Sequence, residues 1–433
     1  MRRLPLVLAT AALCAGLAAA GAGDRPAPPA APPPERGANG SGHERSLAQA
    51  VGADQERLRQ VPADAAGWAR LGSEYVEQAR LTADPSYYPK ADEALHRSLS
   101  LQPGDNVDAL TGLGALANAR HLFAVARDFA DRALAAAPLH WPAYAVLADA
   151  RTQLGDDSGA TDAVQHLLDL RPGTASFARA AYDLEQHGRT DDARAALQQA
   201  LGSAYDGGDK AFCRFQIAEL DRNSGRYEQA LDGYRQALAD DPAYTPALAG
   251  RARAEAALGR TDDALHDYRT ASAAVPLPQY VLELGELEES LGHAEQAREQ
   301  YHLLGAEQQL AAANGVVDDL TLGQYEADHG DPAQAVRLLR AEWDRRHNVL
   351  VADALAWALH RTGADGEALG YADRAAAHGW DNALFLYHRG EIEHALGRTA
   401  EARTHLAEAL ATDPAFNPLQ ARTARTTLQA LGG

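Results

Sequence analysis

The sequence predicts an all-α fold, an α-solenoid of about ten helix-turn-helix units followed by a C-terminal capping helix. Three observations predict this fold. The phrase GRTDDA occurs at 188–193 and again at 259–264, and looser copies recur along the chain. An alanine returns about every 34 residues, and each period holds two apolar stretches of helical spacing separated by a turn signal. A fixed period of this length is typical of stacked supersecondary units, not of one globular core.

The N-terminus reads as a targeting segment. Arg2 and Arg3 precede an apolar run over 4–20 and small residues in an A-x-A pattern, so we expect residues 1–22 to be a secretory signal peptide. A lipid on Cys14, a twin-arginine signal and an uncleaved anchor remain alternatives, although the apolar run is short for a bilayer span. We therefore expect a secreted or extracytoplasmic location in the cell envelope.

Four further segments follow in order. Residues 23–45 are rich in Pro, Ala and Gly and cannot bury a core, so they are expected to form a disordered linker. Residues 46–63 are expected to be an N-terminal half-repeat helix, 64–416 the repeat array and 417–433 the capping helix. No apolar stretch after the N-terminal run is long enough to span a membrane.

The repeated phrase is a turn between two helices. Gly259 follows an apolar-periodic stretch and is expected to end a helix in the left-handed conformation. Thr261 is expected to cap the next helix, with Asp262 and Asp263 in its first turn, where the helix dipole favours anions. Pro276 closes that second helix. The phrase recurs because this turn recurs in each unit.

A ladder of alanines defines one face of the second helices. Ala264, Tyr268 and Ala271 have spacings that place them on the same helical face, where small residues allow a neighbouring helix to approach closely. Equivalent alanines recur at steps of 33 to 38 residues. The ten members are Ala91, Ala126, Ala160, Ala193, Ala230, Ala264, Ala297, Ala335, Ala368 and Ala402.

With this pattern the chain resembles the tetratricopeptide-repeat (TPR) family, of the exported bacterial type. The family pattern places Trp, Leu, Gly and Tyr on the first helix, then Ala, a large residue, Ala and Pro on the second. The first unit supplies Trp68, Leu71, Gly72 and Tyr75, followed by Ala91, Leu95, Ser98 and Pro103. Later units lose the Trp, and some carry Ala in place of Gly, as at Ala218, Ala252 and Ala356. The resemblance implies a right-handed superhelix and is nearly silent on function.

Three insertions interrupt the period. They are LTADPSYYPKA in the first unit, GSAYDGGDK between the fourth and fifth units, and EQQLAAANGVVDD between the seventh and eighth. Each is expected to bend the superhelix or to present a loop, and the alternative is that it is tolerated surface length.

Composition excludes several classes of function. The net charge is −20 without any Lys/Arg run, which argues against nucleic acid as a partner and against anionic membrane surfaces. Only two lysines among 40 basic residues, with abundant Ala, Arg and Gly, indicate a high-GC host. No nucleophile, metal-protease or phosphate-loop motif is present, so we expect no enzyme and no cofactor.

The resemblance implies a binding groove on the concave face, lined by the first helices of successive units. Exposed aromatics beside charged groups are what a protein or peptide partner needs, while the alternative is that these rings pack between helices. The expected partner-binding residues are Phe212, Phe215, Glu219, Arg222, Arg253, Glu286, Trp357, His360, Tyr387, Glu391 and His394. Asp149, Tyr182, Glu185 and Glu289 are expected to line the same groove.

Two other binding modes bear on this groove. The family's carboxylate clamp uses paired Lys and Asn, which the corresponding positions here lack. His360 and His394 occupy the same position in successive units, with Glu391 one turn before His394, and such a set could hold a transition metal. The expectation is a non-enzymatic scaffold for a protein or peptide partner. The alternative is an envelope carrier of a small ligand or metal at the C-terminal end of the groove.

Overall fold

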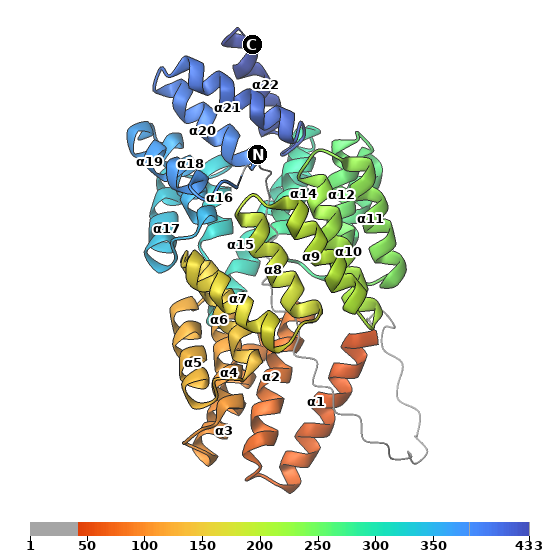
Figure 1. Ribbon diagram of the computed structural model, residues 1–433. Helices are drawn as coiled ribbons and strands as arrows, with labels where there is room; N and C mark the ends of the chain where they lie inside the picture. Colours follow the sequence, from red (N-terminus) through yellow and green to blue (C-terminus); the bar gives the residue numbers. More distant parts are fainter. Residues whose placement is uncertain (1–41, 381, 433) are drawn as a thin grey trace.

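The computed structural model describes residues 42–380 and 382–432, and these residues form 22 α-helices and no strand (Figure 1). The predicted signal peptide, 1–22, and the linker up to residue 41 lie outside the described residues. No helix among the described residues is long and apolar enough to cross a membrane.

The helices form ten antiparallel pairs between a first and a last single helix. The flanking helices are α1 (Gly42–Gln60) and α22 (Gln420–Ala430). The first five pairs are α2 (Ala65–Thr82) with α3 (Tyr87–Leu101), α4 (Val107–Ala119) with α5 (Phe123–Ala136), α6 (Trp141–Leu154) with α7 (Asp157–Leu170), α8 (Thr174–Gln186) with α9 (Thr190–Ser203), and α10 (Gly207–Arg222) with α11 (Tyr227–Asp240). The last five are α12 (Thr245–Ala257) with α13 (Thr261–Ala274), α14 (Pro278–Ser290) with α15 (Ala294–Ala313), α16 (Leu320–Asp328) with α17 (Pro332–Arg345), α18 (Val349–Arg361) with α19 (Asp365–Ala376), and α20 (Ala383–Ala395) with α21 (Thr399–Thr412). The solenoid predicted from the 34-residue period is therefore confirmed.

The turn inside each unit differs from its prediction in one detail. Gly259 has φ +75°, so it ends α12 in the left-handed conformation as expected. Thr261, however, is the first residue of α13 and not its cap. The cap position belongs to Arg260, whose backbone N–H donates to the Glu255 carbonyl at 2.8 Å while its own carbonyl accepts from Ala264. The Gly-Arg turn is already closed by backbone hydrogen bonds, so the helix starts one residue earlier and needs no side-chain cap.

The alanine ladder forms the buried interface between helices. Each of its ten members is at most 2% exposed. Close approach is also built into the first helices: a Cβ added to Gly250 would lie 2.5 Å from the ring of Tyr234 on the preceding helix. Small residues on one helix therefore make room for large residues on the next, as the sequence pattern predicts.

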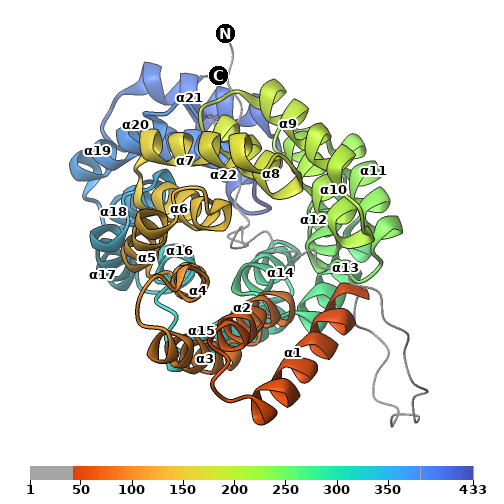
Figure 2. The same ribbon diagram turned by 60° about the horizontal axis from the view of Figure 1, so that its bottom comes forward.

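The array winds into a superhelix tight enough for successive turns to touch. In Figure 2 the helices follow one another around a ring, and α6 and α7 lie close to helices from the C-terminal half. Arg346 is 1% exposed and donates to the side-chain oxygen of Gln153 at 2.8 Å, across 193 positions. The Arg346 guanidinium also lies 5.2 Å from the ring centre of Phe123. In a simple solenoid each repeat contacts only its neighbours. These contacts instead join successive turns of the superhelix, and we call the interface that they form the seam.

One of the predicted insertions supplies part of this seam. Residues 307–319 extend α15 and then form the connection to α16, where the backbone N–H of Val317 donates to the Arg120 carbonyl at 3.0 Å. Asp318 pairs with His121 at 3.8 Å and with Arg346 at 3.5 Å. Burial opposes ionisation of Asp318, but His121 and Arg346 outweigh it and hold its pKa below the ordinary value. The insertion therefore joins two turns of the superhelix.

Candidate functional site

A cavity of about 380 Å³ lies on the concave side of the superhelix. The first helices of six consecutive units, α10, α12, α14, α16, α18 and α20, contribute to its wall. Further wall residues come from α11 and α13, from the connection between α21 and α22, and from α22. Its lining includes five carboxylates, namely Glu283, Glu286, Asp328, Asp353 and Asp413, against three arginines, namely Arg222, Arg253 and Arg425. Carboxylates therefore outnumber guanidinium groups on its wall.

A buried charge network forms the wall on the α10 and α12 side. Glu219 accepts hydrogen bonds from Arg253 at 2.8 Å, from Arg222 at 3.2 Å and from the Tyr234 hydroxyl. Arg253 also pairs with Glu283 at 3.3 Å. Burial raises the pKa of Glu219, but the charges of Arg253 and Arg222 outweigh burial and lower it below its ordinary value. Glu219 is therefore held ionised as the centre of the network.

The opposite wall, on α16, α18 and α20, is aromatic. The Trp357 indole N–H donates to Asp328 at 2.8 Å, and its ring lies 5.4 Å from that of Tyr387. His388 stacks on Trp357 with ring centres 4.3 Å apart and bonds through Nδ1 to Asp353 at 2.9 Å. Trp357 and Tyr387 are only 6% and 2% exposed, so both rings are largely packed between neighbouring helices.

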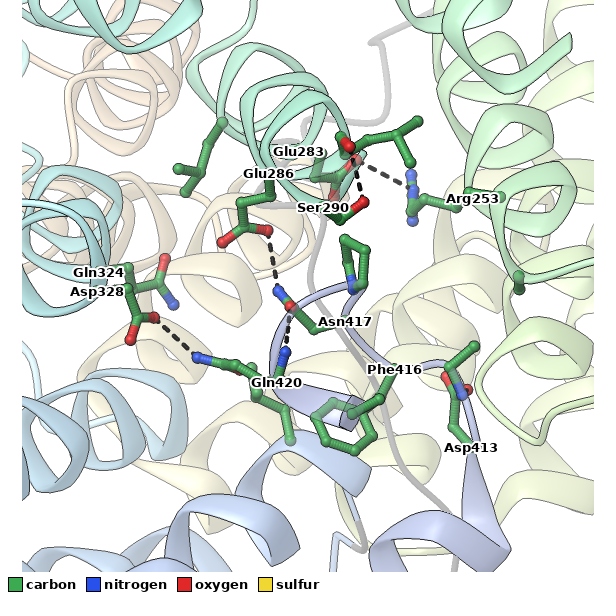
Figure 3. Close-up of a pocket in the computed structure, with 18 of the residues that line it drawn as sticks. Arg253, Glu283, Glu286, Ser290, Gln324, Asp328, Asp413, Phe416, Asn417 and Gln420 are labelled. Carbon is green, nitrogen blue, oxygen red and sulfur yellow. Dashed lines mark hydrogen bonds and ion pairs between the residues drawn. The ribbon is translucent and has the colours of Figure 1, made fainter. Parts of the chain in front are cut away.

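A segment of the chain itself lies across this groove. We call residues 413–420 the inner segment; it comprises the connection between α21 and α22 and the first residue of α22. Figure 3 shows Asn417 pointing toward Glu286 and Gln420 pointing toward Asp328. Asn417 donates to Glu286 at 2.9 Å, and Gln420 donates to Asp328 at 2.8 Å. Phe416 is buried with its ring centre 5.4 Å from that of Tyr387.

The structure brings together part of the predicted groove set. Glu219, Arg222, Arg253, Glu286, Trp357 and Tyr387 belong to this cavity wall or to the buried networks directly behind it. Phe215 instead packs in the core against Tyr234 and Tyr244, with ring centres 6.0 and 5.9 Å away. This is the alternative that the sequence left open for the central aromatics. Phe212, on the same helix, is half-buried.

The histidines nominated for a metal do not assemble a site. His360 bonds through Nδ1 to Asp365 at 2.6 Å, while His394 is exposed and Glu391 is half-buried. Within residues 42–380 and 382–432, no group of three or more His, Cys, Asp or Glu side chains is placed to hold a metal ion. Equivalent repeat positions share a helix face, but their side chains here have different surroundings.

The four other predicted lining residues lie elsewhere or at the edge of the groove. Asp149 pairs with Arg179 at 2.7 Å, and Glu185 is buried against Asn223. Tyr182 packs on the core of the C-terminal units. Glu289 accepts a hydrogen bond from Tyr301 at 2.7 Å.

Several residues that line the groove were not predicted from the sequence, because their positions do not follow from the repeat pattern. Gln324 and Asp328 lie on α16, and Asn417 and Gln420 belong to the inner segment. One signal was available for the inner segment. The connection 413–419 is the longest between any two helices of the described chain and carries Pro414 and Pro418.

A family model described as "Tetratricopeptide repeat" matches residues 215–276, 250–306 and 366–415. The matched residues are therefore similar to tetratricopeptide repeats, and the helix pairs and the alanine ladder continue the same architecture along the described chain.

Among curated proteins, "Cellulose synthase 1 operon protein C" of Komagataeibacter xylinus is 29% identical over 232 residues. The match covers 52% of this chain but only 14% of that protein. This chain therefore corresponds to a small part of that relative.

Three solved structures are similar. A thermophilic TPR protein of Thermus thermophilus is 24% identical, covering 45% of this chain and 98% of that one, with a TM-score of 0.39. PilW, described as a widely conserved type IV pilus biogenesis factor, is 20% identical over 46% and 92%, with a TM-score of 0.39. The human IFIT1 dimer with PPP-AAAA is 14% identical over 85% and 86%, with a TM-score of 0.46.

Proposed function

We propose that this protein is an exported, non-enzymatic TPR scaffold that binds an extended segment of a protein partner in its concave groove. The observation that carries the proposal is the cavity wall, where first helices of six units present carboxylates, arginines and aromatic rings to one space. Rings supply contact area and charges fix the register of a bound chain. Export is supported by the N-terminal pattern of residues 1–22 alone.

The test is affinity capture from cell-envelope and culture fractions. Trp357 and Tyr387 are poor probes because they are buried, and truncating them would cost about 3–5 kcal/mol of stability. Leu282 and Gln324 line the cavity, are half-buried, and can be changed with less damage. The groove variant Leu282→Arg/Gln324→Arg fills the cavity with two long charged side chains.

A matched control places the same two substitutions outside the groove. Leu303 and Gln198 are exposed on α15 and α9, so the control is Leu303→Arg/Gln198→Arg. The proposal predicts a protein retained by the wild type and the control and lost by the groove variant. Equal retention by all three forms would place the partner's site outside the groove.

A second candidate function follows from the size of the cavity. A volume of about 380 Å³ falls within the range of small-molecule sites. An envelope carrier of a small ligand would gain thermal stability from that ligand without any protein partner. A metabolite screen by thermal shift, repeated on the groove variant, separates this function from the scaffold, because a stabilising compound should lose its effect in the variant.

A further inference from the structure

We infer that the inner segment, 413–420, is a resident ligand of the groove that the partner must displace, and that the partner's segment carries an aromatic side chain followed by N–H donors. This inference rests on the proposed peptide-binding function and names the chemistry of the partner. The inference begins from one observation. Consecutive parts of the inner segment contact groove residues that belong to units far apart in the sequence.

The first contact lies at the junction of α10 and α11. The Tyr227 hydroxyl donates to the Asp413 carboxylate and accepts from the backbone N–H of Ala415 at 3.0 Å, across 188 positions. Arg222 lies 3.9 Å from the same carboxylate. Asp413 is buried, so this contact anchors the start of the inner segment beside Arg222 of the buried charge network.

The second contact covers the aromatic wall. Phe416 is 6% exposed and packs on Tyr387, which in turn contacts Trp357. These are the rings that the sequence nominates for partner binding. The chain's own phenylalanine therefore occupies the position that a partner's aromatic side chain would take.

The third contact satisfies two groove carboxylates. Asn417 donates to Glu286, and Gln420 donates to Asp328, whose other oxygen already accepts the Trp357 indole N–H. Without these donors, the two carboxylates would each lose a hydrogen bond inside the cavity, and an unsatisfied, partly buried acceptor is costly. An occupant that replaces the inner segment must therefore bring N–H donors of its own, as carboxamide or cationic side chains do.

Release of the inner segment need not unfold a repeat. Residues 413–419 are not helical, so leaving the groove breaks side-chain contacts and the hydrogen bond from the Ala415 backbone N–H to Tyr227, while the ten helix pairs keep their own backbone hydrogen bonds. Because it is tethered, the segment competes at a high effective concentration, in the millimolar range for short connections. A free peptide should therefore bind poorly until the resident segment is loosened.

The experiment uses the full chain with Asn417→Asp/Gln420→Glu. Both substitutions keep side-chain size, and the carboxylate introduced at position 417 would keep the oxygen that accepts the backbone N–H groups of Leu419 and Gln420 at the start of α22. They remove both donors and set carboxylates against Glu286 and Asp328. Gln429→Glu makes the same chemical change on an exposed part of α22 and serves as the control.

The probe is a fluorescein-labelled peptide of residues 411–422, ATDPAFNPLQAR. Anisotropy should show it binding the released variant at least about tenfold more tightly than the wild type or the control. Replacing the phenylalanine of the peptide by alanine should abolish that gain. Hydrogen exchange should show faster exchange at 413–420 in the variant alone, with helices α4 to α18 unchanged.

Two results would overturn the inference. One is exchange at 413–420 that stays as slow in the variant as in the wild type. The other is faster exchange without any binding of the peptide. If the variant fails to fold, Asn417→Asp with Glu286→Gln reverses the donor and acceptor, and it should restore slow exchange if the contact is as described.

The experiments distinguish failure of this inference from failure of the proposed scaffold function. Partner capture by the wild type without peptide binding to the released variant would remove the resident-ligand inference alone. Peptide binding without partner capture by the wild type, the control or the released variant would contradict the scaffold and leave the intramolecular contact standing.

Discussion

The side-chain amide of Asn417 donates to the carboxylate of Glu286 at 2.9 Å, joining residues 131 positions apart. The first belongs to the connection before the capping helix and the second to α14, in the seventh unit. In a solenoid whose repeats touch only their neighbours, these residues would not meet. Their contact places part of the chain inside the groove that its own repeats build, and the seam at Arg346 shows a second departure from nearest-neighbour packing.

Replacing Gly155 by alanine should weaken the seam between turns. Gly155 has φ +76°, and an added Cβ would lie 2.6 Å from the backbone oxygen of His347 in the adjacent turn. Gly259→Ala is the matched control, because Gly259 has φ +75° and a Cβ added there would meet nothing within 4 Å. Both variants should lose roughly 1–2 kcal/mol from the left-handed backbone. Gly155→Ala should lose about a further 1–3 kcal/mol from the clash.

Urea denaturation of the two glycine variants measures the difference. Equal free energies of unfolding would mean that the close approach of Gly155 and His347 does not exist in solution.

Arg346→Met should be strongly destabilising. The guanidinium is buried, pairs with Glu342 and Asp318, and donates to Gln153 across the seam. Removing it leaves two carboxylates without their shared cation, for which about 3–5 kcal/mol is typical. Arg337→Met, whose side chain is 66% exposed, should change the free energy of unfolding by less than about 0.5 kcal/mol. A comparable loss in both variants would contradict the buried seam.

Ala264→Leu tests the alanine ladder. Ala264 is fully buried between helices, so the larger side chain should overpack the contact and cost about 1–3 kcal/mol. Ala400→Leu carries the same change on an exposed face of α21 and should cost much less. The measurement is the free energy of unfolding of the two variants by chemical denaturation. Similar losses in both would mean that Ala264 does not lie in the interface between helices.

Glu185→Gln should change how stability depends on pH. Burial raises the pKa of Glu185 to about 8, so its proton is bound in the folded chain and lost in the unfolded chain at intermediate pH. The stability it contributes is present below the unfolded pKa and declines, by up to about 1.4 kcal/mol per pH unit, until the pH passes about 8.

The measurement is the difference in free energy of unfolding between wild type and variant at pH values of about 6 and about 9, on either side of the raised pKa. Relative to the wild type, the variant should have a higher free energy of unfolding at the higher pH than at the lower pH. A difference that is the same at both values would mean that Glu185 titrates normally.

Much of the fold could be predicted because the repeat is local. A glycine such as Gly259 and an alanine such as Ala264 each act within one unit, so their roles can be read from spacing. The superhelical seam could not be predicted, since Gln153 and Arg346 carry no mark of their pairing across 193 positions. The pairing across the seam depends on the pitch of the superhelix. That pitch is set by the sum of small rotations between successive units.

The candidate site was predictable only in part for the same reason. Register placed Arg253, Glu286 and Trp357 on first helices that face the cavity. It could not place Phe416 or Asn417, because these residues lie after the last repeat and reach the groove by a non-helical connection. Residues at equivalent positions, such as His360 and His394, also differ in burial.

The most direct test of the groove as the partner's site is photo-crosslinking from within it. A photoreactive amino acid replaces Gln324, which lines the cavity, and in a second chain replaces Gln198, which is exposed on α9. The account predicts that a captured partner crosslinks from position 324 and not from position 198, and more strongly when the inner segment is released. A partner that crosslinks from position 198 and not from position 324 would contradict it.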